Sequence, residues 1–228
     1  MKRGIVGFVL IFFIILFSIV FVNAAFSFGS DILVPGEYGD VEDDRFDIIC
    51  PNNTALAGIR GYSTDQIETI GTFTCRNVDG VTDTVIGGQY GDDNEGTSFE
   101  LICPSGYYIK SVSGSANLQI DSLGPLTCVD KNGNEQSAGS VYGETTDSFS
   151  LACLSNSAIG RIQGTYRSTE AESLGPIYCR QIINLCTPKT CANYPDQCAN
   201  NLSNGCNGTI DCTNNCSSGD VCNEITGY

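Results

Sequence analysis

Three segments of this chain repeat one another at a period of about fifty residues, and each segment is framed by two cysteines. The framing pairs are Cys50 and Cys75, Cys103 and Cys128, and Cys153 and Cys179. Their separations are 25, 25 and 26 residues, so we predict that each pair forms a disulfide within its own unit. A repeat of this length indicates that each unit buries its apolar face against its neighbours. Three units therefore predict a closed object or a short stack.

Two short motifs recur in every unit. The first is an opener of alternating apolar residues before the first cysteine, as in Phe99-Glu-Leu101-Ile-Cys103. The second is a Tyr-Gly-acid tripeptide upstream of each opener. Its three copies are Tyr38-Gly39-Asp40, Tyr90-Gly91-Asp92 and Tyr142-Gly143-Glu144. Alternation of apolar and polar side chains predicts strands with one buried face, so the fold class is all-β.

The second unit illustrates the strands that we expect. Turn-forming residues divide it into four strands, near Thr82–Gly88, Ser98–Cys103, Tyr107–Gly114 and Leu118–Cys128. The apolar residues Ile109 and Val112 are three positions apart rather than two, and Ile159 and Ile162 repeat that spacing. A regular strand does not explain this spacing, which predicts a β-bulge after each first cysteine.

The N-terminus and the charge limit the classes of function. Lys2 and Arg3 precede an apolar run that ends at Val22-Asn23-Ala24, which is typical of a signal peptide over residues 1–24 and predicts a secreted or surface location. An uncleaved membrane anchor is the alternative, because the run is close to the length of a span. The net charge of −15 opposes binding to nucleic acid or anionic membranes.

The chain contains no histidine, which excludes Ser-His and Cys-His catalytic pairs and imidazole metal ligands. We therefore expect no enzymatic activity and no cofactor. A glycoside hydrolase that uses a pair of carboxylates is the remaining enzymatic alternative.

Residues 184–228 form a different region, with seven cysteines and almost no aliphatic residues. The cysteines are Cys186, Cys191, Cys198, Cys206, Cys212, Cys216 and Cys222. So short a region cannot bury enough apolar area to fold unaided, and we predict a disulfide-rich module. The cysteines are not spaced in Cys-x-x-Cys pairs, which argues against zinc. Sequons for N-glycosylation stand at Asn52, Asn201, Asn207 and Asn215.

The repeats resemble two known families. The pattern Ile120-Asp121-Ser122-Leu123-Gly124 in units of this size resembles jacalin-type lectins. The segment from Ser98 to Tyr107, which follows Gln89-Tyr90-Gly91, is similar to the repeats of vitelline membrane outer layer protein I, an extracellular coat protein. Both resemblances imply a β-prism of three four-stranded, Greek-key-like sheets over residues 25–183. The units would span about 32–75, 82–128 and 136–179.

The jacalin resemblance implies a carbohydrate-binding protein. In that family a Gly-x-x-x-Asp loop holds the sugar, and its acid corresponds to Asp121 here, with Glu68 and Glu172 in the other two units. The glycine positions hold Asn117, Thr64 and Ser168. Since Asn adopts positive φ more readily than Thr or Ser, we expect the site at Asn117 and Asp121. The coat-protein resemblance implies the alternative of a cross-linked structural component.

Acidic loops and tyrosines offer weaker candidate sites. Asp40, Glu42, Asp92 and Asp93 provide oxygen ligands of the kind that calcium prefers, although soluble acidic turns are the simpler interpretation. The rings of the Tyr-Gly pairs either stack on a sugar or pack against a neighbouring sheet.

The odd number of cysteines in the tail leads to a prediction. One thiol is left over when the others pair, and such a thiol on an exported chain usually links to another molecule. We expect a disulfide-linked homodimer, or a link to a matrix partner, through Cys222. Non-reducing electrophoresis should show a dimer that disappears with reductant and in Cys222→Ser. A monomer with one titratable thiol would contradict the link.

Overall fold

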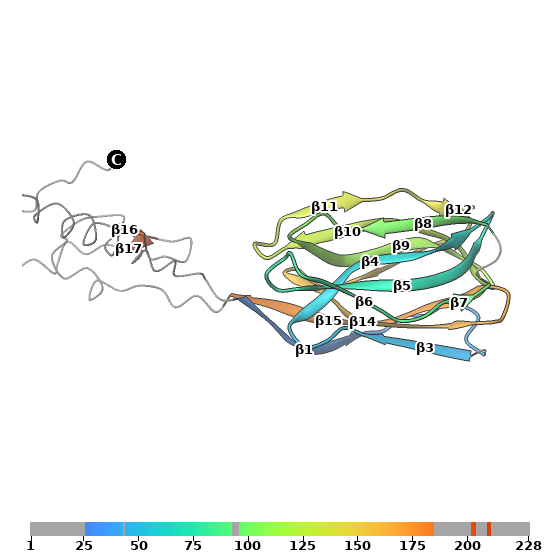
Figure 1. Cartoon of the computed structure of the whole chain (residues 1–228), viewed down its shortest axis with the longest axis horizontal. Helices are drawn as coiled ribbons and strands as arrows, with labels where there is room; N and C mark the ends of the chain where they lie inside the picture. Colours follow the sequence, from blue (N-terminus) through green and yellow to red (C-terminus); the bar gives the residue numbers. More distant parts are fainter. Residues whose placement is uncertain (1–25, 43, 93–95, 185–201, 204–208, 211–228) are drawn as a thin grey trace, which may run out of the picture. The chain divides into compact units, whose positions relative to one another are not determined.

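Residues 26–184 fold into three β-sheets in the computed structural model of this chain (Figure 1). The structure describes residues 26–42, 44–92, 96–184, 202–203 and 209–210. In the last two ranges, β16 (Leu202–Ser203) and β17 (Thr209–Ile210) pair with each other. No helix long and apolar enough to cross a membrane occurs in the described part of the chain. The expected signal peptide, all seven tail cysteines, Asp93 and the sequons at Asn201, Asn207 and Asn215 lie outside the described residues.

Each sheet is built on one long hairpin. The first sheet consists of β4 (Thr54–Ser63), β5 (Ile67–Asn77), β6 (Asp83–Ile86), β7 (Tyr90–Gly91) and β8 (Thr97–Ile102). The second consists of β9 (Tyr107–Ala116), β10 (Ile120–Asp130), β11 (Glu135–Ala138), β12 (Tyr142–Gly143) and β13 (Ser148–Ala152). The third consists of β14 (Ser157–Tyr166), β15 (Ala171–Asn184), β1 (Phe26–Val34), β2 (Tyr38–Gly39) and β3 (Asp44–Ile49). The four strands expected in the second unit are confirmed as β6, β8, β9 and β10.

The sequence units and the sheets are out of phase. The strand that opens each unit pairs with the hairpin of the unit before it, so β8 pairs with β4 and β13 pairs with β9. The opener of the first unit, β3, pairs with β14 of the last hairpin and closes the ring. Each sheet therefore combines strands from two units, and the N-terminal strands complete the C-terminal sheet.

The expected bulges are present in all three hairpins. Leu56 pairs with Cys75 and Gly58 pairs with Thr74, which leaves Ala57 as an extra residue. The extra residues in the other two hairpins are Lys110 and Gly160. The bulge explains why apolar residues three apart both face the interior.

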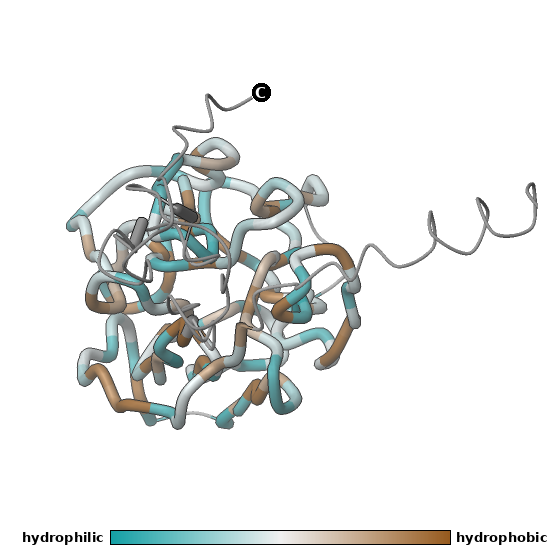
Figure 2. Tube along the Cα trace, turned by 90° about the vertical axis from the view of Figure 1, so that its left-hand side faces the viewer, coloured by the Kyte–Doolittle hydropathy of each residue, from teal (hydrophilic) through white to brown (hydrophobic). Residues whose placement is uncertain are grey.

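The interior of the prism is filled by the inward faces of the three sheets. Hydrophobic and hydrophilic residues alternate along the tube when the prism is viewed along its strands (Figure 2). Fully buried side chains come from every sheet, and they include Leu56, Phe73, Ile109, Leu126, Ile159 and Ile177. Burial of such side chains supplies the main driving force for folding.

Each disulfide joins two different sheets. The bonds are Cys50–Cys75 between the third and first sheets, Cys103–Cys128 between the first and second, and Cys153–Cys179 between the second and third. These are the pairs that the matched spacings predict. Because the units are out of phase with the sheets, a bond within one unit of sequence becomes a bond across one edge of the prism.

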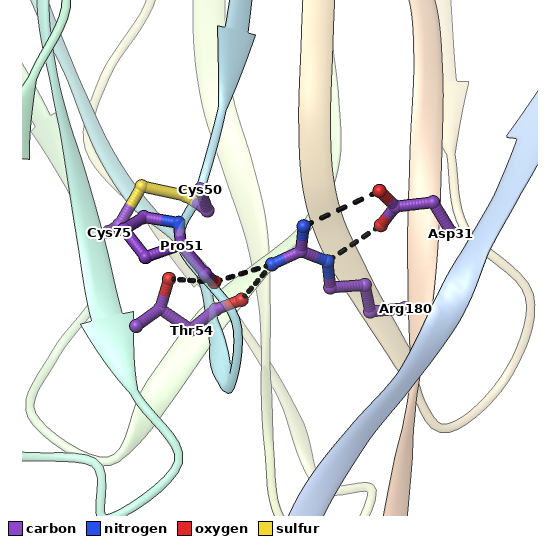
Figure 3. The surroundings of a disulfide bond; sticks show 6 residues. All are labelled: Asp31, Cys50, Pro51, Thr54, Cys75 and Arg180. Atoms are coloured by element: carbon purple, nitrogen blue, oxygen red, sulfur yellow. Dashed lines mark hydrogen bonds and ion pairs between the residues drawn. A yellow bond between two sulfur atoms is a disulfide. The ribbon is translucent and has the colours of Figure 1, made fainter.

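A buried arginine reinforces one of these edges (Figure 3). Arg180 is only 6% exposed, and its Nε donates to the carboxylate of Asp31 at 2.6 Å. Its Nη1 donates to the carbonyls of Pro51 at 2.8 Å and Thr54 at 2.7 Å, in the connection that leads into the first sheet. The guanidinium thus ties the third sheet to the first beside the Cys50–Cys75 disulfide.

The first sheet repeats this arrangement, but the second does not. Arg76, which is 4% exposed, binds Asp83 and donates to the carbonyls of Cys103, Pro104 and Tyr107. The corresponding residue of the second sheet is Val129, which packs in a small apolar cluster with Tyr108 and Ile182. Its cross-strand neighbour Glu135 pairs instead with Lys110 at 2.5 Å.

Removal of the buried arginine should destabilise the prism. Arg180→Ala removes the donor to the carbonyl of Thr54 and to the carboxylate of Asp31, whereas the carbonyl of Pro51 still accepts from Thr54, and we expect a loss of about 3 kcal/mol or more in the free energy of unfolding. Arg161→Ala is the matched control, because Arg161 pairs with Asp47 on the exposed face of the same sheet and should contribute less than about 1 kcal/mol. Urea unfolding measures both. Equal losses would contradict the assigned role of Arg180.

Tyr108 should make stability depend on alkaline pH. Its ring is 1% exposed and its hydroxyl donates to the carbonyl of Asn77 at 2.9 Å. Burial raises the pKa of Tyr108 from 10.0 to about 12, with Asp79 adding to the effect. Above pH 10 the unfolded chain releases this proton while the folded chain keeps it, so stability should fall between pH 10 and 12. Urea midpoints measured across this range should fall less steeply in Tyr108→Phe; an unchanged slope would be inconsistent with this assignment.

Candidate functional site

The turns of the three long hairpins meet at one end of the prism, which we call the hairpin end. Their residues are 64–66, 117–119 and 167–170. Equivalent side chains from the three turns touch one another. Gln66 donates through Nε2 to Glu170 Oε2 at 2.8 Å, and Gln119 donates through Nε2 to Gln66 Oε1. The three units therefore place their mapped sugar-loop residues around one common centre.

The Tyr-Gly-acid tripeptides fix these turns in place. The backbone N–H of Asp40 donates to the carbonyl of Leu118 at 2.9 Å, and that of Glu144 donates to the carbonyl of Asp65 at 2.6 Å. In both cases a tripeptide of one sheet holds the turn of another. The glycine is required here, because Gly39 has a φ of +102° and a Cβ there would overlap the carbonyl oxygen of Glu172.

The tyrosines of the tripeptides pack against the sheets through one side of the ring. Each ring stacks on the opener phenylalanine of a neighbouring sheet. The three pairs are Tyr38 on Phe149 at 4.9 Å, Tyr90 on Phe46 at 4.8 Å and Tyr142 on Phe99 at 5.0 Å between ring centroids. The structure thus favours the packing interpretation of these rings and not the one in which they face a sugar.

Two of the three mapped acids are buried and engaged. Glu68 is 5% exposed and accepts a hydrogen bond from Thr64, the residue at the glycine position of its own loop. Glu172 is 2% exposed and pairs with Arg167 Nε at 3.3 Å. A sugar hydroxyl in solvent cannot reach the carboxylate of Glu68 or Glu172 unless the turn rearranges. These two candidate ligand-binding residues therefore differ in accessibility from the acid of the second unit.

The second unit presents its acid to solvent. Asp121 is half-buried and accepts a hydrogen bond from the hydroxyl of Thr146. Asn117 is exposed four residues earlier, and Leu118 between them is 74% exposed. A carboxylate, an amide and an apolar side chain thus fall within five consecutive residues, on the turn and on the start of β10. This combination offers acceptors, donors and an apolar contact to a small polar ligand.

A surface hollow of about 490 Å³ also lies at the hairpin end, beside the turn of the third unit. It is lined by Glu42, Asp44, Tyr166, Arg167, Ser168 and Thr169. Sequence reasoning identified Ser168 as a glycine position but missed Tyr166 and Arg167. The available signal was Arg167, a charged residue directly before Ser168. The jacalin-type loop pattern does not include a residue at that position.

The acidic loops do not form a cation site in the described structure. Asp40 accepts the backbone N–H of Glu42 at 3.1 Å, and its other oxygen lies 3.6 Å from Arg167. Within the described ranges, no group of three His, Cys, Asp or Glu side chains is placed so that it could hold a metal ion. Asp92 is half-buried beside Gly91, and its carbonyl accepts from the hydroxyl of Thr69.

Comparison with known proteins identifies the fold. No family profile and no curated protein matches the sequence. Among solved structures, a mannose-specific jacalin-related lectin from Morus nigra in complex with mannose matches with a TM-score of 0.50 and 16% identity, over 66% of this chain and 95% of that chain. Malaysian banana lectin matches with a TM-score of 0.47 and 19% identity, over 66% and 98%. A mannose-binding jacalin-related lectin from Ananas comosus matches with 0.47 and 23%, over 64% and 96%.

The described part of the chain therefore has the β-prism fold of the jacalin-related lectins. This confirms the fold class that the repeats predict. The match to the Morus nigra lectin, at a TM-score of 0.50 and 16% identity, supports the fold alone.

Proposed function

We propose that this protein is a secreted or surface-displayed, non-enzymatic lectin that binds a neutral carbohydrate at the hairpin end through Asn117 and Asp121. One observation carries the proposal. Of the three acids that stand in the position of the lectin aspartate, Asp121 alone is accessible to solvent, while Glu68 and Glu172 are 5% and 2% exposed.

The chemistry of this turn suits a sugar. An ionised carboxylate accepts hydrogen bonds from two neighbouring hydroxyls, and an amide both donates and accepts. Leu118 adds an apolar surface for the C–H groups of the sugar ring. Because the Morus nigra lectin is mannose-specific, mannose and mannan are the first ligands to test on this chain.

A structural role in an extracellular coat is the second candidate. The seven tail cysteines favour it, because an odd thiol offers a covalent link to a partner. Extraction distinguishes the two functions. A lectin should dissolve without denaturant or reductant, whereas a coat component should resist extraction unless denaturant or reductant is added.

Substitution of Asp121 tests the site. Each hydrogen bond to the charged carboxylate contributes about 1.5–3 kcal/mol, so Asp121→Ala should abolish retention on a mannan column. Glu135→Ala is the control, because it removes an exposed carboxylate of the same sheet far along the strands from the turns. A glycan array with the full chain identifies the ligand if mannan fails.

A third variant distinguishes the two positions at the hairpin end. Arg167→Ala alters the hollow of the third unit and changes no residue of the turn of the second unit. Loss of binding in Arg167→Ala together with unchanged binding in Asp121→Ala would move the site to the third unit and refute Asp121 as the sugar ligand.

A further inference from the structure

A second hollow lies on the outer face of the first sheet, over β4, β5 and β8. It has a volume of about 320 Å³. Its lining residues are Arg60, Gly61, Tyr62, Gly71, Thr72, Gln89, Ser98, Phe99 and Glu100. Two cross-strand pairs of β4 and β8 form one wall, since Arg60 is opposite Glu100 and Tyr62 is opposite Ser98.

An ion pair places a donor and an acceptor side by side in this hollow. Arg60 Nη2 lies 2.5 Å from Glu100 Oε1, and Arg60 Nη1 donates to the hydroxyl of Thr74 at 2.8 Å. The two contacts hold the guanidinium in one orientation while a third of the side chain stays accessible, and half of the Glu100 side chain is accessible too. A guanidinium has five N–H donors and a carboxylate accepts up to four, so both groups have capacity for a ligand.

Glycines keep the floor of the hollow low. Gly61 faces the ring of Phe99, and a Cβ at Gly61 would come within 2.7 Å of that ring. Gly71 is buried on the adjacent strand. The ring of Phe99 is buried in the core, so the floor is formed by backbone, and the polar groups of Arg60, Glu100 and Gln89 surround it. Small-molecule sites commonly contain a few directed polar groups of this kind.

The corresponding positions of the other two sheets lack this combination. In the second sheet, serines stand at both positions of the ion pair, Ser113 and Ser150. In the third sheet, Gln163 is opposite Asp47, and Arg161 takes both oxygens of that aspartate at 2.7 Å. The hollow therefore depends on residues that distinguish the first sheet from the other two.

We propose that this hollow is a second carbohydrate site, which binds one neutral sugar residue through two neighbouring hydroxyls. A pair of adjacent hydroxyls both donates and accepts, so it can bridge Glu100 and Arg60 at once. The ion pair is neutral as a whole and the chain carries a charge of −15, which favours a neutral sugar over an anionic one. The ring of Tyr62 offers an aromatic contact to the C–H face of the sugar.

This inference is independent of the hairpin-end site, because none of its residues belongs to the three turns. Two sites on different surfaces would let one chain hold two glycan branches, and linked sites raise avidity without any new contact.

Ligand-observed NMR on the full chain tests the proposal. Methyl glycosides of mannose, glucose, galactose and N-acetylglucosamine serve as the probes. In the Asp121→Ala background, at least one probe should receive saturation from the protein and shift the amide signals of Gly61 and Gly71. Arg60→Ala in that background should weaken this binding at least tenfold, as loss of a charge-assisted hydrogen bond implies.

Matched controls separate the outcomes. Arg161→Ala removes another exposed arginine–carboxylate pair, Arg161–Asp47 of the third sheet, and should leave the probe signal unchanged. Arg60→Lys keeps the charge without the planar fork and should also weaken binding. Equal binding in Arg60→Ala and Arg161→Ala, or no probe signal in the Asp121→Ala background, would overturn the second site. The hairpin-end site would fail separately, if Asp121→Ala bound a mannan column as well as the unaltered chain does.

Discussion

Every edge of this prism depends on a covalent bond between two sheets. Each disulfide connects the end of an opener strand to the long hairpin of the next sheet, and together the three bonds link the three sheets in a closed cycle. On the loop-entropy model each contributes about 3 kcal/mol by restricting the unfolded chain. The bonds lie toward the end opposite the hairpin turns. The turns are held by backbone hydrogen bonds and stacked rings, so the two ends of one prism are secured by different interactions.

The buried arginines show how this arrangement tolerates variation between the copies. Two edges use a guanidinium that satisfies a carboxylate and several carbonyls, whereas the third uses Val129 in an apolar cluster. Glu135 stands opposite Val129, where the other two sheets have the aspartate that pairs with the arginine, and it binds Lys110 at the surface. Polar and apolar solutions to the same packing position thus coexist in one molecule, which agrees with the near equivalence of buried ion pairs and well-packed apolar groups.

Local patterns in the sequence predicted much of the fold. Alternation gave the opener strands, matched spacing gave the disulfides, and the three-residue spacing of Ile109 and Val112 gave the bulge. The sequence could not show that each opener strand pairs with the hairpin of the preceding unit. A repeat has the same sequence pattern whether its strands pair within the unit or with a neighbouring unit. The burial of Glu68 could not be predicted from the sequence either. The Thr64 hydroxyl engages that carboxylate, and only the conformation of the turn reveals the contact. The hollow beside Arg60 depends on two strands that lie forty residues apart in the chain.

The phase shift between units and sheets bears on how such a chain arises. A single unit of this sequence would donate its opener to a hairpin that it does not possess, and its own hairpin would lack an edge strand. Three identical chains could satisfy one another only by exchanging openers in a ring, which is domain swapping with threefold closure. The present molecule has the connectivity of such a trimer joined into one polypeptide. The copies are not identical within that ring, and the Arg60 hollow of the first sheet is one difference between them.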